Sequence, residues 1–381
     1  MARPFTSKVD TIRPAYGFDD ISLAPGTDTT DPADVDLSQE FCGIPLAVPI
    51  IASAMDAVVS PATAGLIRAQ GSLAVINLEG LWFRYADPAS AYEAIAAAPR
   101  ERVQELFAEL YSAPLDESLI AARVAEIRAA GSPVVIAGTP QAIGRHGDAV
   151  LAAKIDLLVI QSQVSSARHI ASGYAPLELS AFVRRAGIPV AIGNTSNAAA
   201  AYALMEQGAA AIFVGVGPGN ACTTREVLGI GVPQVTAVSD VAAARDAYLA
   251  DSGRYVPVVA DGGIRKGGEI AKALAVGADA VMIGSPLARA TEAPGRGFNW
   301  GMAAPSPTLP RGTRIDVGTV GSLAQVFHGP SRVTDGSENL VGAVRQSAAA
   351  LGVATLRGFR DVEVMYAPAA ATEGKSWQRG R

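Results

Sequence analysis

The chain has 381 residues, of which 49% are hydrophobic and 18% are charged, and its formal net charge is −5. This composition allows a large apolar core and argues against extensive disorder, while the acidic balance argues against a dedicated nucleic-acid binder. The two cysteines lack metal-ligand spacing and are too few for a disulfide scaffold. No window reaches the roughly 18 uninterrupted apolar residues of a membrane span, and the N-terminus lacks the apolar run of a signal peptide. We therefore expect a cytoplasmic protein with reduced thiols and no membrane partner.

Short apolar runs recur along the chain, and most are rich in Val and Ile without alternation, which predicts parallel strands buried on both faces. Ala-rich segments with helical spacing separate several of them, at 196–207, 239–250 and 267–276. This alternation predicts an α/β fold, a single-domain (β/α)8 TIM barrel, with a doubly wound open sheet as the alternative. The runs are 46–55, 72–79, 133–138, 157–163, 189–194, 210–217, 256–263 and 280–285.

Two regions depart from the repeat of strand and helix. Residues 80–130 form an enlarged connection that we expect to be helical, with breaks at Pro88 and Pro114. Residues 291–336 are rich in Gly and Pro and too long for an ordinary connection, so we expect an active-site loop. A closing helix is predicted at 338–351. The barrel would then span 1–366 as one catalytic domain, followed by a disordered tail at 367–381.

A glycine-rich loop after the sixth run, residues 214–225, holds Cys222 and ends in hydroxyl side chains and Arg225. Glycine allows backbone geometry that other residues resist, so the loop can present a thiol and backbone amides to a ligand. Barrel enzymes carry their chemistry at such strand ends, which favours a nucleophile; a buried structural thiol is the alternative. The thiolate is the reactive form, and Arg225 or nearby amides could favour it. Cys42 precedes the first strand and is expected to be a core residue.

Two further strand ends are rich in glycine: the seventh run ends in Asp261, Gly262 and Gly263, and the eighth ends in Gly284 and Ser285. The loops after strands seven and eight usually bind phosphate in these barrels. Glycine lets backbone amides approach an anion, and Ser285 adds a hydroxyl at a helix start. Asp261 would repel phosphate but could accept hydrogen bonds from a ribose diol. A phosphate site is predicted, with tight turns as the alternative.

The end of the first strand reads Ser53-Ala-Met55-Asp56. Ser53 and Met55 could face the barrel mouth, although methionine is more often a core residue. Asp56 could be no more than a helix N-cap.

Taken together, four motifs resemble the IMP dehydrogenase/GMP reductase family over nearly the whole chain. They are GPGNACTTR at 217–225, GVPQ at 231–234, the run from 260 to 288, and SAMD at 53–56. The chain is most similar to the IMP dehydrogenase-related branch that lacks the regulatory CBS domains. The resemblance implies a purine-nucleotide oxidoreductase that uses NADPH or NAD(H) and assembles as a homotetramer or octamer.

The resemblance also implies roles for individual residues. Cys222 would attack C2 of the purine to form a covalent adduct, Thr224 and Asp335 would handle the proton, and the backbone of Gly217, Gly219 and Cys222 could wrap a potassium ion. The implied nucleotide-binding positions are Ser53, Met55, Asn220, Asp261, Gly262, Gly263, Gly284, Ser285, Val320 and Gly321. The implied cofactor-binding positions are Gln161, Ser162, Asn194 and Gly215.

Several positions depart from the family pattern. Asn220 replaces a common serine, Gln161 stands where Asp is usual, and Phe213 stands where Lys or Arg is common. Ala210 replaces a frequent Asp, and Gly318 with the following threonine replaces the usual Arg-Gly. We therefore expect the nicotinamide pocket to be the most altered part of the site.

The direction of the reaction depends on whether water hydrolyses the covalent Cys222 adduct, as in an IMP dehydrogenase, or ammonia is released on its formation, as in a GMP reductase. The family's flap carries an Arg-Tyr pair in IMP dehydrogenases, whereas here Arg332 is followed by Val333. This absence favours NADPH-dependent reductive deamination of GMP to IMP and ammonia. Asp335 aligns with a glutamate of GMP reductases and could pass a proton to the ammonia; a turn with Gly336 is the alternative. NAD-dependent oxidation of IMP to XMP and a catalytically reduced nucleotide-binding regulatory protein are the other candidate functions.

Overall fold

The main sheet closes on itself through one strand that is broken in its middle. The computed structural model describes residues 11–302 and 312–368. Its parallel sheet runs in the order β5–β4–β12–β11–β10–β9–β8–β7–β6. The two ends of this order, β5 (Leu73–Ala74) and β6 (Ile76–Asn77), are separated only by Val75 and so form one strand. The sheet is therefore a closed eight-stranded barrel, which confirms the predicted (β/α)8 fold and excludes the open sheet.

All eight predicted runs contain a strand, and nearly every strand residue is buried. One face of each strand packs in the barrel interior and the other lies under the helices, which explains why the runs lack alternation. The remaining strands are β4 (Ile50–Ala52), β7 (Val135–Gly138), β8 (Leu157–Gln161), β9 (Val190–Thr195), β10 (Ile212–Val214), β11 (Val258–Asp261) and β12 (Ala280–Ile283).

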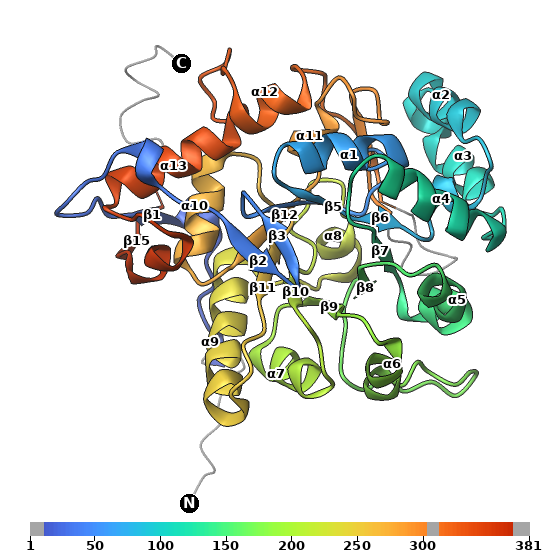
Figure 1. The fold of residues 1–381 in the computed structure, drawn as a ribbon, viewed down its shortest axis with the longest axis horizontal. Coiled ribbons are helices and arrows are strands. Elements are labelled where there is room, and N and C mark those ends of the chain that lie inside the picture. Colours follow the sequence, from blue (N-terminus) through green and yellow to red (C-terminus); the bar gives the residue numbers. More distant parts are fainter. Residues whose placement is uncertain (1–10, 303–311, 369–381) are drawn as a thin grey trace, which may run out of the picture.

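Helices surround the barrel (Figure 1). The predicted helices at 196–207, 239–250, 267–276 and 338–351 correspond to α7 (Ala198–Glu206), α9 (Gln234–Ser252), α10 (Gly267–Ala275) and α13 (Leu340–Ala350). The others that cover strands are α1 (Pro61–Ala69), α4 (Ser118–Ala129), α5 (Pro140–Ala152) and α6 (Leu179–Ala186). Two short helices follow strand ends, α8 (Thr224–Leu228) after β10 and α11 (Ser285–Ala288) after β12. Within the described residues, none of the helices combines the length and the apolar character needed to cross a membrane.

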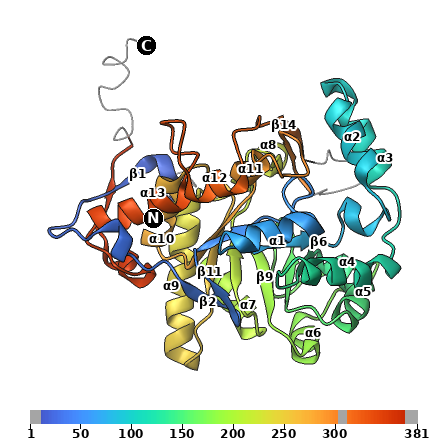
Figure 2. The same ribbon diagram turned by 45° about the horizontal axis from the view of Figure 1, so that its top comes forward.

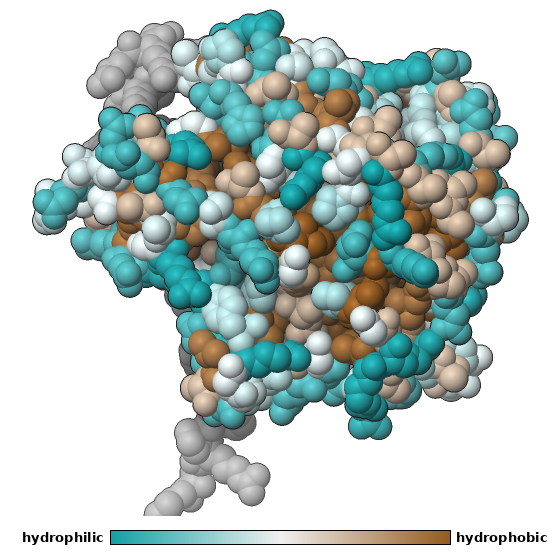
Figure 3. Space-filling view, in the orientation of Figure 1, coloured by the Kyte–Doolittle hydropathy of each residue, from teal (hydrophilic) through white to brown (hydrophobic). Residues whose placement is uncertain are grey.

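An antiparallel hairpin covers the N-terminal end of the barrel. It consists of β2 (Gln39–Phe41) and β3 (Ile44–Leu46), whose apolar side chains join the interior cluster formed by the strands. Cys42 lies in its turn, packs against the same cluster, and has a pKa raised to about 12 by burial. The thiol is therefore a poor nucleophile, as expected for a core cysteine. Figure 3 shows an apolar area beside this hairpin, over β7–β9.

The enlarged connection at 80–130 is helical, as predicted. It holds η4 (Leu81–Phe83), α2 (Ala89–Ala97), η5 (Arg100–Arg102), α3 (Val103–Leu110) and α4. Pro88 immediately precedes α2, and Pro114 lies between α3 and α4. In this connection, which the structure describes throughout, no CBS pair is inserted. Figure 2 shows α2 and α3 projecting from one edge of the barrel.

A buried carboxylate joins this connection to the barrel. Asp56 is 1% exposed, and its Oδ2 accepts hydrogen bonds from the hydroxyl of Tyr111 at 2.7 Å and the amide of Leu81 at 2.9 Å. The indole of Trp300 in turn donates to the Tyr111 hydroxyl at 2.8 Å. Asp56 is not the cap of α1, because Ser60 holds that position. Its role is to satisfy donors of the inserted helices at the end of β4.

The segment after β12 is only partly a loop. Residues 291–336 contain the antiparallel pair β13 (Phe298–Trp300) and β14 (Arg314–Asp316), followed by α12 (Leu323–His328). Residues 303–311 of this predicted active-site loop, and 369–381 of the predicted tail, lie outside the described part of the chain.

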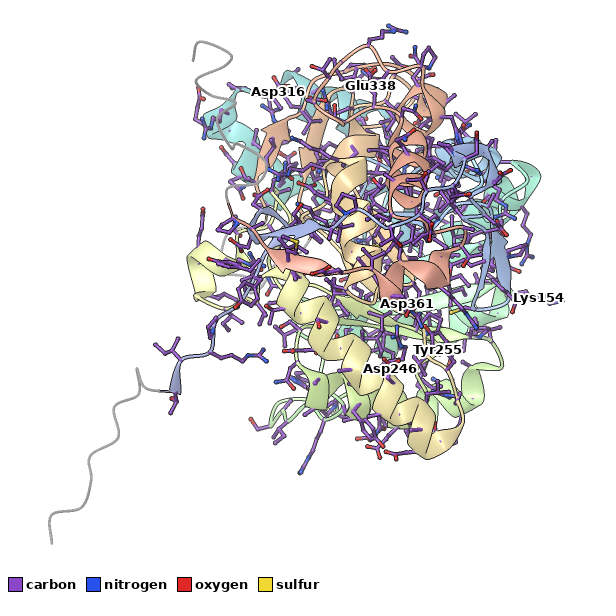
Figure 4. The ribbon with its side chains drawn as sticks, turned by 90° about the vertical axis from the view of Figure 1, so that its left-hand side faces the viewer. Lys154, Asp246, Tyr255, Asp316, Glu338 and Asp361 are labelled. Atoms are coloured by element: carbon purple, nitrogen blue, oxygen red, sulfur yellow. The ribbon has the colours of Figure 1, made fainter. Side chains whose placement is uncertain are left out.

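The first and last described segments pair with each other. β1 (Ile21–Leu23) and β15 (Val364–Tyr366) form an antiparallel ladder next to η6 (Leu356–Asp361). Arg360 of η6 and the buried Arg245 of α9 both bind Asp279, at 2.5 and 3.2 Å. Tyr255 donates to the same carboxylate and lies between α9 and η6 (Figure 4). This cluster holds the C-terminal segment against the barrel.

The hairpin generates the first prediction. Phe41 is fully buried in the interior cluster, so Phe41→Ala should lower the free energy of unfolding by about 3–5 kcal/mol through lost burial and a cavity. Ile12→Ala, at a side chain that is 70% exposed, should change it by less than about 0.5 kcal/mol. Denaturant unfolding followed by circular dichroism measures both. A loss at Phe41 no larger than at Ile12 would show that the hairpin does not seal the barrel.

Candidate functional site

A large cavity opens at the C-terminal ends of the barrel strands. Its volume is about 1750 Å³, whereas pockets for one small molecule usually measure roughly 300–1,000 Å³. The predicted site residues that line it are Ser53, Met55, Gln161, Ser162, Asn194, Gly215, Gly217, Gly219, Asn220, Cys222, Thr224, Asp261, Gly262, Gly263, Gly284 and Ser285. The closed barrel thus brings together residues from six strand ends that are distant in the sequence.

Cys222 lies between β10 and α8 with its sulfur beside a buried hydroxyl. Its amide donates to the carbonyl of Gly219 at 3.1 Å, which folds the loop into a tight turn. Its Sγ is 3.0 Å from Oγ1 of Thr224, which is 2% exposed. Gln163 donates to the same Oγ1 through Nε2 at 3.1 Å. Thr224 is therefore held between an amide donor and the sulfur, and its hydroxyl can donate to a thiolate.

The Arg225 side chain holds the cysteine loop through two backbone carbonyls. Its Nε donates to the carbonyl of Val216 at 3.2 Å, and its Nη2 donates to that of Val232 at 2.8 Å. Burial lowers the pKa of Arg225, and the nearby Cys222 partly offsets this effect. The guanidinium thus combines a structural role with a positive charge near the sulfur.

Asp261 sits among amide side chains that reach it from across the barrel mouth. Its Oδ2 accepts from Nε2 of Gln161 at 2.7 Å and from Nδ2 of Asn194 at 2.8 Å. The same Nε2 of Gln161 also donates to Oδ1 of Asn194 at 2.7 Å, which closes a triangle. Burial raises the pKa of Asp261 to about 6, against the opposing effect of the two amides. The residues predicted for ribose and for cofactor therefore form one cluster.

Gln234 of the GVPQ motif connects the ends of the neighbouring strands β10 and β11 below this cluster. Its Nε2 donates to the carbonyls of Val214 at 2.8 Å and Asp261 at 3.0 Å. Gly215 lies between them with φ +153°, and a Cβ at this position would approach the carbonyl oxygen of Asp261 to 2.1 Å. Glycine is required here by the close approach of β10 and β11.

The strand ends predicted for phosphate meet in one corner of the cavity. Gly262 and Gly263 have φ of +87° and +79°, a conformation that favours glycine. A Cβ on Gly284 would approach Sδ of Met55 to 2.8 Å, so this position must also stay small. Ser285 follows at the first residue of α11. The corner presents backbone and a hydroxyl with little side-chain bulk, which suits an anion.

A hydrogen-bonded chain of side chains crosses this corner. Asn299 donates through Nδ2 to Oγ of Ser285 at 2.9 Å, and Ser285 donates to Oδ1 of Asn220 at 2.8 Å. Asn299 is 1% exposed, and its Oδ1 has no partner within the described residues. These hydrogen bonds link β13 with the cysteine loop through the glycine-rich corner.

The rest of the cavity lies over β7 and β8. The ring of His169 stacks on that of Tyr174 at 6.0 Å between centroids, and the His169 Nε2 is 2.9 Å from the tyrosine hydroxyl. Gln141 and Arg145 of α5 line the same part, and the Gln141 amide lies 3.4 Å from the Tyr174 hydroxyl. This half has a flat aromatic surface and a cation, separate from the glycine-rich corner.

Three predicted site residues do not line the cavity. Val320 and Gly321 pair through their backbones with the segment that follows α11: the Val320 amide donates to the Arg289 carbonyl at 2.9 Å. Asp335 is exposed and accepts from the amide and hydroxyl of Ser337 at 2.9 and 2.6 Å. These hydrogen bonds lower its pKa and hold it in a turn. Asp335 thus lies in a local turn with Ser337 and does not line the cavity.

Some contributors to the site were not predicted from the sequence. Gln163 lies two residues beyond the end of β8 (Leu157–Gln161), and its polar side chain at a strand end was the signal that could have placed it at the cavity. Asn299 had none, because it stands in a Gly- and Pro-rich segment without periodicity. Phe213, expected to alter the nicotinamide pocket, is instead fully buried in the barrel interior.

Comparisons with known proteins agree over the whole barrel. A family model described as the IMP dehydrogenase / GMP reductase domain matches residues 15–303. An uncharacterized oxidoreductase of Mycolicibacterium smegmatis is 42% identical over 361 residues, which cover 92% of this chain and 96% of that protein. An inosine-5'-monophosphate dehydrogenase of Haemophilus influenzae is 47% identical over 148 residues, 39% of this chain and 28% of that protein. The crystal structure of an IMP dehydrogenase/GMP reductase-like protein from Corynebacterium glutamicum has a TM-score of 0.87 at 37% identity, covering 93% of this chain and 95% of that chain.

Asp261 generates the second prediction. Its pKa is raised from 3.8 to about 6 in the folded protein, so its ionisation costs stability as the pH rises through that window. Asp261→Asn removes this charge. Between pH 4.5 and pH 7.5 the variant should therefore gain about 2 kcal/mol in its free energy of unfolding relative to the wild type. Thermal unfolding of both proteins at the two pH values measures the difference. A change in stability that is equal at both pH values would contradict the raised pKa.

Proposed function

The chain belongs to the IMP dehydrogenase/GMP reductase family, and we propose that it is a purine-nucleotide oxidoreductase that acts at C2 of the base through a covalent adduct on Cys222. The observation that carries the proposal is the position of the Cys222 sulfur, which lies on the cavity wall 3.0 Å from the Thr224 hydroxyl. A nucleophile needs a partner that stabilises its ionised form or accepts its proton. The Thr224 hydroxyl contacts the sulfur, and the positive charge of Arg225 lies near it.

The cavity offers separate places for the parts of a nucleotide. The phosphate would bind where Gly263, Gly284 and Ser285 expose backbone and a hydroxyl, as helix starts and glycine-rich turns do for anions. The ribose diol would donate to the carboxylate of Asp261, whose Oδ2 is already occupied by the two amides. The base would then extend toward Cys222. Ser53 and Met55 line the same side of the cavity.

The leading reaction is the reductive deamination of GMP. The thiolate of Cys222 adds to C2, and the amino group at C2 takes up a proton and leaves as ammonia. A hydride is then delivered to C2, and the sulfur departs as IMP is formed. Overall, GMP, NADPH and two protons give IMP, ammonium and NADP⁺. Thr224 contacts the sulfur and is the residue best placed to pass the proton.

The half of the cavity over β7 and β8 supports a nicotinamide dinucleotide as co-substrate. The whole cavity, at about 1750 Å³, exceeds the roughly 300–1,000 Å³ of a pocket for one small molecule. In this half, the stacked rings of His169 and Tyr174 suit a planar base. Arg145 supplies a cation there, which favours the additional phosphate of NADPH. When bound, the nicotinamide supplies or accepts the hydride at C2.

The oxidation of IMP to XMP with NAD is the second candidate. One observation favours it: Asp335, the expected proton donor for ammonia, is exposed and held in a turn by Ser337 rather than lining the cavity. The same cavity and the same cysteine serve both reactions. The two candidates differ in the fate of the adduct: ammonia is released from C2 in the reduction of GMP, whereas water hydrolyses the adduct in the oxidation of IMP.

A potassium ion fits the cysteine loop only in part. The loop offers the backbone carbonyls of Gly217, Gly219 and Cys222, and the Gly219 carbonyl already accepts the Cys222 amide at 3.1 Å. Three carbonyls fall short of the oxygen shell that replaces the hydration of K⁺ in proteins. No step of the proposed reaction therefore depends on the ion.

Turnover assays provide the third prediction. With GMP and NADPH, absorbance at 340 nm should fall and ammonia should be released. With IMP and NAD, we expect no formation of NADH. Turnover with IMP and NAD alone would replace the leading reaction by the second candidate. Nucleotide binding without turnover in either assay would instead indicate a regulatory binding protein.

Substitution of the cysteines provides the fourth prediction. Cys222→Ala should reduce kcat at least about 1,000-fold, because the covalent route needs the nucleophile, while the Kd for GMP should change by less than about threefold. Cys42→Ala is the matched control, because Cys42 lies in the hairpin at the opposite end of the barrel; its turnover should equal that of the wild type. Appreciable turnover by Cys222→Ala would end the covalent mechanism.

A further inference from the structure

Gln161 departs from the family pattern, and the structure gives it a partner that its sequence position did not suggest. It ends β8, whereas Asp261 ends β11, and two strands, β9 and β10, lie between them in the sheet. The 2.7 Å hydrogen bond from Nε2 to the Asp261 Oδ2 therefore crosses the barrel mouth. Val159 and Val259, two residues earlier on the same strands, lie in the interior cluster. Gln161 and Asp261 thus form a polar layer directly above the apolar interior.

The triangle of hydrogen bonds fixes the orientation of both amides. Gln161 donates through Nε2 to Asn194 Oδ1 and to Asp261 Oδ2, and Asn194 donates through Nδ2 to Asp261 Oδ2. A primary amide nitrogen carries two hydrogens, and both hydrogens of Gln161 are used. Turning either amide over would place its oxygen against a carboxylate oxygen, which is unfavourable. Each amide thus presents only donors to Asp261.

Both amides bind the same carboxylate oxygen. This arrangement leaves Oδ1 of Asp261 available to the cavity, with its direction set by the two bonds on Oδ2. A carboxylate oriented in this way can accept hydrogen bonds from vicinal hydroxyls. Asn194 is buried and belongs to β9, so the second donor is fixed by the sheet.

The amides also oppose the cost of burying the charge. Burial is the largest influence on the Asp261 pKa and raises it, while Asn194 and Gln161 lower it; no charged side chain contributes. The titratable and charged groups that line the cavity are Asp19, Glu79, Arg84, Arg145, His169, Tyr174, Glu178, Cys222, Arg225 and Arg265. Neutral amides, rather than a cation, thus keep this carboxylate ionised near neutral pH.

We propose that Gln161 is a positioning residue that orients the Asp261 carboxylate for the 2′- and 3′-hydroxyls of a ribonucleotide and keeps it in its charged, accepting form. This inference rests on the proposed function and reassigns Gln161 from the cofactor pocket to the ribose pocket. Gln161 acts through Asp261, so its removal changes how nucleotide binding depends on pH and on the diol. A residue needed only for packing would weaken binding of ribose and deoxyribose ligands equally.

The test compares IMP with 2′-deoxy-IMP by isothermal titration calorimetry from pH 5 to 9. The two ligands share the same phosphate, so the ratio of their Kd values isolates the contact with the diol. In the wild type this preference for ribose should be lost as the pH falls through about 6, where Asp261 becomes protonated. In Gln161→Met, which keeps the volume and removes the donors, the same loss should occur about one pH unit higher.

The controls separate this inference from the proposed function. Gln207→Met, at the partly buried end of α7, should keep the wild-type profile. If Gln161→Met shows an unshifted profile, Gln161 does not position Asp261, although the proposed function stands. If the wild type binds IMP without any preference for ribose, the ribose contact itself is wrong. Failure of the wild type to bind IMP at all would overturn both proposals.

A stability measurement without ligand tests the same contact independently of any defect in nucleotide binding. Gln161→Met should destabilise the protein more at pH 7.5 than at pH 4.5, because it removes donors from a carboxylate that is charged only at the higher pH. In an Asp261→Asn background this difference between the two pH values should disappear. A destabilisation that is equal at both pH values, or that persists in the Asp261→Asn background, would show that Gln161 serves packing alone.

Discussion

The closure of the sheet is the constraint on which the rest of the molecule depends. The segment from Leu73 to Asn77 pairs with β4 through its first half and with β7 through its second. Closed pairing tilts and staggers the strands around a common axis and leaves no exposed edge. It also directs every carboxyl end to one rim, so that Gln161, Asn194 and Asp261 can meet although they are far apart in the sequence. An open sheet would spread these residues along a line.

At the site, hydrogen bonds from amide side chains offset the cost of burying the Asp261 carboxylate. The interior below it is apolar and includes fully buried Phe213, and the polar layer above must satisfy its own groups because water has limited access. Amides of Gln161, Asn194 and Gln234 do this for Asp261, and Gln163 does it for Thr224. Neutral amide side chains, rather than ion pairs, thus satisfy the side chains of Asp261 and Thr224 among the described residues.

The fold could be predicted from the sequence far better than the details of the site. Strands buried on both faces leave long apolar runs, and glycines at their ends mark the rim, so the barrel and the meeting of the Cys222 loop with the glycine-rich strand ends at one rim were predictable. The position of Asp335 outside the cavity was not predictable, because a residue in a turn carries no periodic signal. Its position depends on local hydrogen bonds to Ser337. Contacts across the barrel, such as that from Gln161 to Asp261, depend on the stagger of the closed sheet, which no local pattern encodes.

The buried carboxylate of Asp56 couples the helical connection at 80–130 to the cavity. It follows Met55, which lines the cavity, and it accepts from Tyr111 of the helical connection, whose hydroxyl also receives the indole of Trp300. Trp300 is adjacent to Asn299, which donates to Ser285 in the glycine-rich corner of the cavity. Replacing residues 80–130 by another domain would remove hydrogen-bond donors from a buried carboxylate and disturb the segment after β4 that lines the cavity. The helical connection is therefore structurally coupled to the cavity, and the two must change together.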